Sequence, residues 1–166
     1  MYVASGYALF YLAPLSRISA AEQELERALR DDPLNLLFRT TLGFFHLGTG
    51  KIAVGERELR QVLELDDRLW IAHAWLCGAA IVDGRWPEAL AWAEKAHSVV
   101  PQSPAVTGLL AGVLARTGES ERSMELRTKL GSGDAYGAPA GLFYFHAAAF
   151  AVGAGSLVVR ESRRAA

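Results

Sequence analysis

This chain is poor in cysteine and has no excess of basic residues, and both shortages narrow what it can be. Its one cysteine in 166 residues, Cys77, excludes an internal disulfide and a zinc site built from several cysteines. Seventeen lysines and arginines stand against 18 aspartates and glutamates, so the formal net charge is -1. A protein that follows a nucleic-acid backbone needs a basic surface. We therefore expect no nucleic-acid partner, and the single thiol fits a reducing compartment such as the cytoplasm.

The motifs of common enzyme classes are also missing. The sequence has no G-x-S-x-G segment, no glycine-rich phosphate loop between a strand and a helix, and no nucleophile beside an evident base. His73 and Cys77 are four residues apart, which is the spacing of two metal ligands on one helix face, but no further ligand pair follows at short range. Packing against a neighbouring helix explains both residues. We expect no catalytic residue, no cofactor and no metal site.

What the chain does have is an internal repeat of 34 residues. Small residues return at this interval in three registers and apolar residues in two more, and five agreeing registers over four copies indicate stacked structural units. The registers are Ser16, Gly50, Gly84 and Gly118; Leu9, Gly43, Cys77 and Ala111; Ala21, Gly55, Ala89 and Ser123; Ala8, Leu42, Leu76 and Leu110; and Ala28, Val62, Ala96 and Leu130. The pairs Asp31-Asp32 and Asp66-Asp67 recur at nearly this interval, so a loop role explains them better than an acid-base dyad.

Each copy predicts two amphipathic helices with a break between them. In the third copy, residues 69–84 form the first helix, which ends at Gly84, a residue suited to a left-handed C-terminal cap. Residues 86–100 form the second helix, with Pro87 in its first turn and Pro101 after its last. We expect the two helices of a copy to approach closely where their facing residues are small.

The spacing resembles the tetratricopeptide repeat, whose pattern is W-x2-L-G-x2-Y, then A-x3-F, then P. The segments "RTTLGFFH" and "ALAWAEKAHSVVP" match its two halves, and the likeness covers roughly residues 2–130. It implies an all-α, right-handed solenoid of about four helix pairs plus a terminal helix, with copies near 2–35, 36–69, 70–103 and 104–134. Arg39 and His73 replace the pattern's tryptophan and Gly55 its second-helix alanine, so we expect looser packing in the second copy.

The resemblance implies a non-catalytic protein–protein interaction scaffold, because first helices of such arrays line a concave groove that binds a partner. An apolar helix or extended segment is the expected ligand, and Trp70 and Trp92 are possible surface anchors. More loosely, the chain is similar to repeat arrays attached to bacterial signalling proteins. A neighbouring helix of the same chain filling the groove is the alternative. The groove positions are Leu37, Thr40, Phe44, Leu47, Ile71, Ala74, Gly78, Ile81, Ala105, Gly108, Gly112 and Arg116.

The segment after the array carries no formal charge from Ala135 to Val159, and Arg160, Arg163 and Arg164 follow it. It could anchor the chain in a membrane, which would make the protein a membrane-tethered adaptor. The interpretation that we favour treats 135–166 as an apolar terminal helix with a basic tail, packed on the fourth copy. Such a helix exposes an apolar side, which predicts a homo-oligomer through residues 135–159 or a partner that covers it. The N-terminal stretch has no basic region before its short apolar run, so we expect neither a secretion signal nor a first membrane span there.

Overall fold

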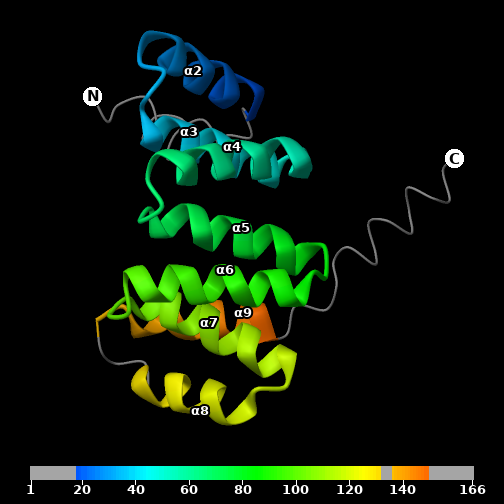
Figure 1. Ribbon diagram of the computed structural model, residues 1–166, viewed down its shortest axis with the longest axis vertical. Helices are drawn as coiled ribbons and strands as arrows, with labels where there is room; N and C mark the ends of the chain where they lie inside the picture. The colour runs from blue at the N-terminus through cyan, green and yellow to red at the C-terminus, as the bar shows by residue number, and fades with distance from the viewer. Residues whose placement is uncertain (1–17, 132–135, 150–166) are drawn as a thin grey trace, which may run out of the picture. The chain divides into compact units, whose positions relative to one another are not determined.

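A computed structural model of the chain describes residues 18–131 and 136–149, and within them the secondary structure is helical (Figure 1). The chain divides after Arg68 into two compact units, and each is described by itself. The described helices of unit 1 are α2 (Ile18–Asp31), α3 (Leu36–Gly48) and α4 (Ile52–Leu65). Those of unit 2 are α5 (Trp70–Val82), α6 (Trp86–Val99), α7 (Pro104–Thr117), α8 (Ser120–Lys129) and α9 (Ala138–Ala149).

The starting residues of the helices repeat the 34-residue period. Helices α3, α5, α7 and α9 begin at residues 36, 70, 104 and 138, while α2, α4, α6 and α8 begin at 18, 52, 86 and 120. Gly84 and Gly118, which follow first helices, have φ angles of +72° and +92°. These left-handed conformations favour glycine and end each helix where the period requires a turn. The prediction of an all-α array of helix pairs is confirmed.

Small residues meet where the two helices of a pair cross. A Cβ atom placed on Gly55 of α4 would lie 2.7 Å from the carbonyl oxygen of Gly43 on α3, so the two backbones come very close. In the last pair, the Ser123 hydroxyl donates a hydrogen bond of 2.7 Å to the carbonyl oxygen of Ala111. The expectation of looser packing in the second copy is wrong, because the loss of a methyl group at Gly55 lets the helices approach rather than separate.

Arg39, at the tryptophan position of the pattern, joins α3 to α4 by polar contacts. Its guanidinium group donates to a Glu58 carboxylate oxygen at 2.9 Å, to the Gln61 side-chain oxygen at 3.0 Å and to the Pro33 carbonyl oxygen at 3.1 Å. An ion pair with two further hydrogen bonds therefore holds this helix pair where the pattern has an aromatic ring.

The core of unit 2 lies between α5, α6 and α7. Cys77, Ala89, Ala93, Val113 and Leu114 are fully buried there and belong to one apolar cluster. Alanines on α6 keep its distance from α5 and α7 short, so the larger side chains of α7 fill the space between them. The pair α5–α6 and the helix α7 therefore form one packed body.

Helix α9 does not continue the alternation of helices past α8, because its main contact is with α7 (Figure 1). A Cβ atom on Gly108 would lie 1.8 Å from the carbonyl oxygen of Gly141, and one on Gly112 would lie 2.5 Å from that of Phe145. Residue numbers rise together along both helices, so α9 runs parallel to α7. Helix α9 therefore occupies the side of α7 that carries Gly108 and Gly112, two of the expected groove positions.

Candidate interaction groove

A pocket of about 250 Å³ lies between α5, α7 and α9, the three first-helix-register elements of unit 2. Residues 71, 74, 78 and 81 of α5 recur every three or four positions, so they share one helix face and form one side of the pocket. Tyr144 on α9 closes the opposite side. The full lining is Trp70, Ile71, Ala74, Trp75, Gly78, Ile81, Ala105, Val106, Leu109, Tyr144, Ala147 and Ala148.

The pocket owes its depth to small residues on α5. A Cβ atom added to Gly78 would meet no other atom within 4 Å, so the missing side chain leaves open space. Gly112, its register mate one repeat later, has the same chemistry but is covered by α9. The pocket is thus the part of the groove that α9 leaves open.

Five of the twelve expected groove residues line this pocket: Ile71, Ala74, Gly78, Ile81 and Ala105. Gly108 and Gly112 instead pack against α9. At these two positions the groove is therefore filled by a helix of the same chain, which was the alternative expectation. Arg116 is exposed, and its guanidinium carbon lies 5.2 Å from the centre of the Trp86 ring. The role of all twelve in binding a partner stays a prediction.

The four expected positions of unit 1 lie on α3 and are described by themselves. Leu37 is 40% exposed, whereas Thr40 is buried and its hydroxyl donates to the Leu36 carbonyl oxygen at 2.6 Å. Phe44 and Leu47 are half-buried, and the Phe44 ring meets that of Phe45 edge to face at 6.0 Å. The Thr40 hydroxyl is therefore already hydrogen-bonded within α3.

Sequence reasoning missed the contribution of α9 to the pocket. Tyr144, Ala147 and Ala148 come from the terminal segment, whereas the expected groove residues all lie in copies two to four. The signal was present, since α9 begins 34 residues after α7. Val106 and Leu109 were also missed, because they lie one position beyond the expected groove face.

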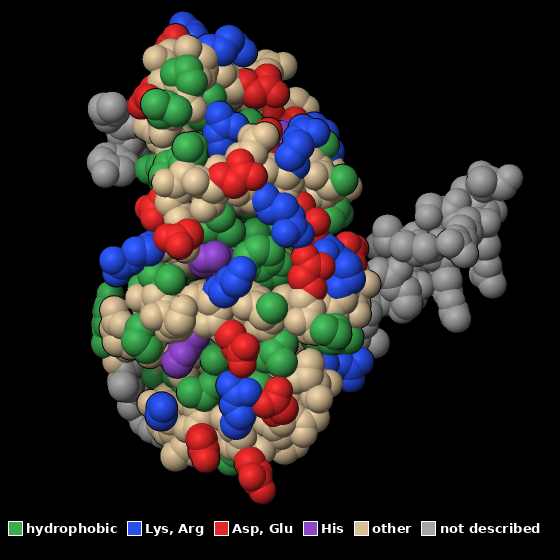
Figure 2. Space-filling view, viewed as in Figure 1, with side chains coloured by type: hydrophobic (Ala, Val, Ile, Leu, Met, Phe, Trp, Pro, Cys, Tyr) green, Lys and Arg blue, Asp and Glu red, His purple; other side chains and the backbone are tan. Residues whose placement is uncertain are grey.

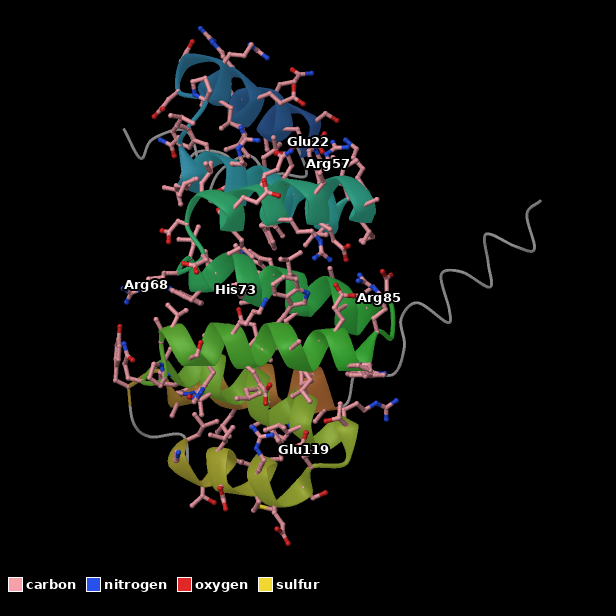
Figure 3. The ribbon with its side chains drawn as sticks, in the orientation of Figure 1. Glu22, Arg57, Arg68, His73, Arg85 and Glu119 are labelled. Carbon is pink, nitrogen blue, oxygen red and sulfur yellow. The ribbon has the colours of Figure 1, made fainter. Side chains whose placement is uncertain are left out.

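The two tryptophans named as surface anchors have different surroundings. Trp70 lines the pocket and is half-buried. Trp92 stacks on His73 with ring centres 5.6 Å apart, and its Nε1 donates to a Glu88 carboxylate oxygen at 3.2 Å. Figure 3 shows His73 pointing from α5 toward α6, the helix that carries Trp92. Contacts within unit 2 therefore engage Trp92, while Trp70 forms part of the pocket lining.

The lining carries no charged side chain. Burial raises the pKa of Cys77 to about 12, so this thiol stays protonated behind the α5 face. On the face of unit 2 seen in Figure 2, by contrast, acidic and basic side chains are interspersed over α6 and α8. In the part of the chain that the structure describes, no three His, Cys, Asp or Glu side chains gather to hold a metal ion.

The segment considered as a membrane anchor is described over residues 136–149 only, and residues 150–159 lie outside the described range. Helix α9 has 12 residues, whereas a membrane-spanning helix needs about 20. Among the described residues, no helix combines the length and apolar character needed to cross a membrane.

Solved structures that are similar to this chain include a pilus biogenesis factor and a tetratricopeptide repeat protein. PilW, a widely conserved type IV pilus biogenesis factor, has 19% identity and a TM-score of 0.68 over 84% of this chain and 66% of its own. A tetratricopeptide repeat protein from Parabacteroides merdae ATCC 43184 has 14% identity and a TM-score of 0.66 over 87% of this chain and 60% of its own. This chain therefore spans less than two thirds of either protein.

The remaining comparisons add no closer relationship. No protein-family model matches the sequence, and no curated protein matches it. At these identities the two structural likenesses show the fold, which is a tetratricopeptide-type α–α solenoid.

Proposed function

We propose that this chain is a non-catalytic protein–protein interaction scaffold whose pocket between α5, α7 and α9 takes apolar side chains from a segment of its partner. The observation that carries the proposal is the pocket itself, about 250 Å³ with a lining of apolar side chains and one glycine. Such a lining gains free energy when a partner's apolar surface replaces water. Trp70, Trp75 and Tyr144 border it with the residue types that dominate binding energy at protein interfaces.

An α-helix is the segment that the groove favours. Helix α9 already lies on Gly108 and Gly112, so this array accepts an uncharged helix at those two positions. Ala74 and Gly78 hold the same register positions one repeat earlier, and they face the open pocket. A partner helix with apolar residues three or four positions apart would place them there in the same way.

The test is a displayed library of helical peptides selected on the protein, with two glycine variants as probes. Gly78→Leu fills the pocket, and Gly48→Leu is its matched control because a Cβ atom at either glycine meets nothing within 4 Å. We expect enriched peptides with apolar anchors that bind the wild type and Gly48→Leu but lose at least tenfold in affinity for Gly78→Leu. Enriched peptides that ignore Gly78→Leu would contradict the proposed site.

A second variant tests whether the groove includes unit 1. Phe44→Glu places a carboxylate on the expected groove face of α3. If the bound segment extends over that helix, the same peptides lose affinity for Phe44→Glu while the helix content measured by circular dichroism stays unchanged. Full binding to Phe44→Glu would restrict the site to unit 2.

We further propose a cytoplasmic location, supported by a single, buried cysteine thiol that needs no oxidising compartment. The alternative is a membrane-tethered adaptor anchored through residues 135–159. Cell fractionation distinguishes the two locations. A full chain that stays in the membrane fraction and is released only by detergent would contradict the cytoplasmic proposal.

A further inference from the structure

Helix α9 presents an uncharged apolar face to its surroundings. Tyr136, just before the helix, is fully exposed, and Phe143 keeps 67% of its surface exposed. Pro139, Ala140, His146 and Ala147 are exposed on the same helix, which contains no Asp, Glu, Lys or Arg. The neighbouring helix α8 exposes Glu and Arg side chains instead. An aromatic side chain this open on a face without charge marks an interaction surface.

The same face carries a projection and a cavity side by side. Ala147 is exposed and also lines the pocket, so the pocket opens onto this face of α9. Phe143 lies four residues earlier, which is one helical turn. A protruding ring and an apolar pocket one turn apart on a single helix are complementary to each other, though they cannot meet within one molecule.

Two copies related by a two-fold axis would bring them together. If α9 pairs antiparallel with its copy about an axis level with Phe145, each Phe143 lies opposite the other copy's Ala147, at the mouth of that copy's pocket. A two-fold interface requires such reciprocity, in which residue i contacts j and j contacts i. Helix α9 itself contains no Asp, Glu, Lys or Arg, so its copy brings none of these charges from α9. The nearby Arg127 guanidinium of α8 is engaged over the Phe145 ring, 5.6 Å from its centre.

We propose that the chain self-associates through α9, with Phe143 of each copy inserted into the pocket of the other. The occupant of this face is thus a second copy of the chain. The proposal shares the pocket with the proposed function but needs no partner protein. Self-association and partner binding then exclude each other, so the dimer is a closed form that a partner helix opens.

Sedimentation equilibrium of the full chain over a wide concentration range tests the proposal. We expect the wild type to pass from monomer to dimer as its concentration rises. Phe143→Asp would force a carboxylate into an apolar pocket, and we expect it to raise the dimer dissociation constant about thirtyfold or more. Gly78→Leu, which fills the pocket from the other side, should have a similar effect. Circular dichroism checks that each variant keeps its helix content.

Leu34→Asp is the matched control, because Leu34 in unit 1 is 75% exposed and should leave the dimer unchanged. A wild type that stays monomeric, or a Phe143→Asp variant that still dimerises, would overturn the proposal. If the full chain is monomeric and a chain ending at Ala149 dimerises, residues 150–166 cover the face, which also overturns it.

The peptide selection separates this inference from the proposed function. If the chain dimerises and the selection enriches no peptide, only the proposed function is contradicted. If peptides bind and the chain stays monomeric at every concentration, only the self-association is contradicted. If both hold, Phe143→Asp should bind the peptides more tightly than the wild type, because its pocket is no longer occupied by a second copy.

Discussion

Gly78 and Gly112 hold the same repeat position, and their surroundings predict opposite effects of the same substitution. Gly78→Ala should stabilise the protein by about 1 kcal/mol, because alanine is the better helix former and the new methyl group meets open space. Gly112→Ala should destabilise it by about 1–3 kcal/mol, because the methyl group would lie 2.5 Å from the Phe145 carbonyl oxygen and push α9 away. Urea unfolding measures both, and equal signs would contradict the placement of α9.

Cys77 links stability to pH in the alkaline range. Burial raises its pKa from 9.0 to about 12, so the unfolded chain loses this proton before the folded protein does. Stability should therefore be unaffected by this group below pH 9 and fall between pH 9 and 12. At pH 10 we expect the wild type to have lost about 1 kcal/mol more than Cys77→Ala loses over the same range. Parallel pH profiles of the two proteins would show that the thiol is not buried.

At the scale of single residues, the sequence shows which positions hold small side chains. It does not show which helix or side chain packs against each of them. From the sequence, Gly55 predicts weaker packing, because glycine lacks the methyl group of the alanine that the repeat pattern has at this position. The structure shows a closer backbone contact with Gly43 instead. The contact of Trp92 could not be predicted from sequence either. Its stacking partner His73 lies on another helix, and no local spacing in the sequence indicates this pair.

Among the elements, the α3–α4 pair depends on a polar link that an apolar pair would not need. The side chains of Arg39 and Glu58 are 24% and 16% exposed, so removing one charge leaves the other poorly hydrated. Glu58→Ala should cost about 1–3 kcal/mol. Arg39→Met with Glu58→Leu should cost less than Glu58→Ala alone, because well-packed apolar side chains can replace a buried ion pair. Urea unfolding of the wild type, Glu58→Ala and the double variant measures these losses, and a double variant less stable than Glu58→Ala would contradict the prediction.

The order and starting points of the elements follow from sequence, and so does the packing of α9 on the fourth copy, whereas the choice of α7 as its partner helix does not. Helix starts at a constant 34-residue step need only the local signals of glycine, proline and apolar periodicity. Helix α9 keeps that step but packs along α7 through Gly108 and Gly141. A contact between two backbones leaves no side-chain pattern, so the sequence places this helix on the fourth copy but does not distinguish α7 from α8 as its neighbour.

In unit 2, the charged side chains of α6 and α8 and the apolar lining of the pocket lie on different elements. Opposite charges alternate over α6 and α8 on the face seen in Figure 2. The pocket and the outer side of α9 carry none. Exposed charges keep one side hydrated, and the uncharged side gains most from contact with another apolar surface. This separation supports the proposed binding at the pocket.

The separation predicts how association responds to salt. Raising the salt concentration from about 0.05 M to 1 M shortens the screening length severalfold and weakens contacts between exposed charges. Association through an uncharged face should change by less than about twofold over that range, and sulfate should strengthen it because the ion is excluded from apolar surface. Sedimentation equilibrium in chloride and in sulfate measures both effects on the dimer dissociation constant. A tenfold weakening in chloride would mean that the charged face of α6 and α8, rather than α9 and its pocket, forms the contact.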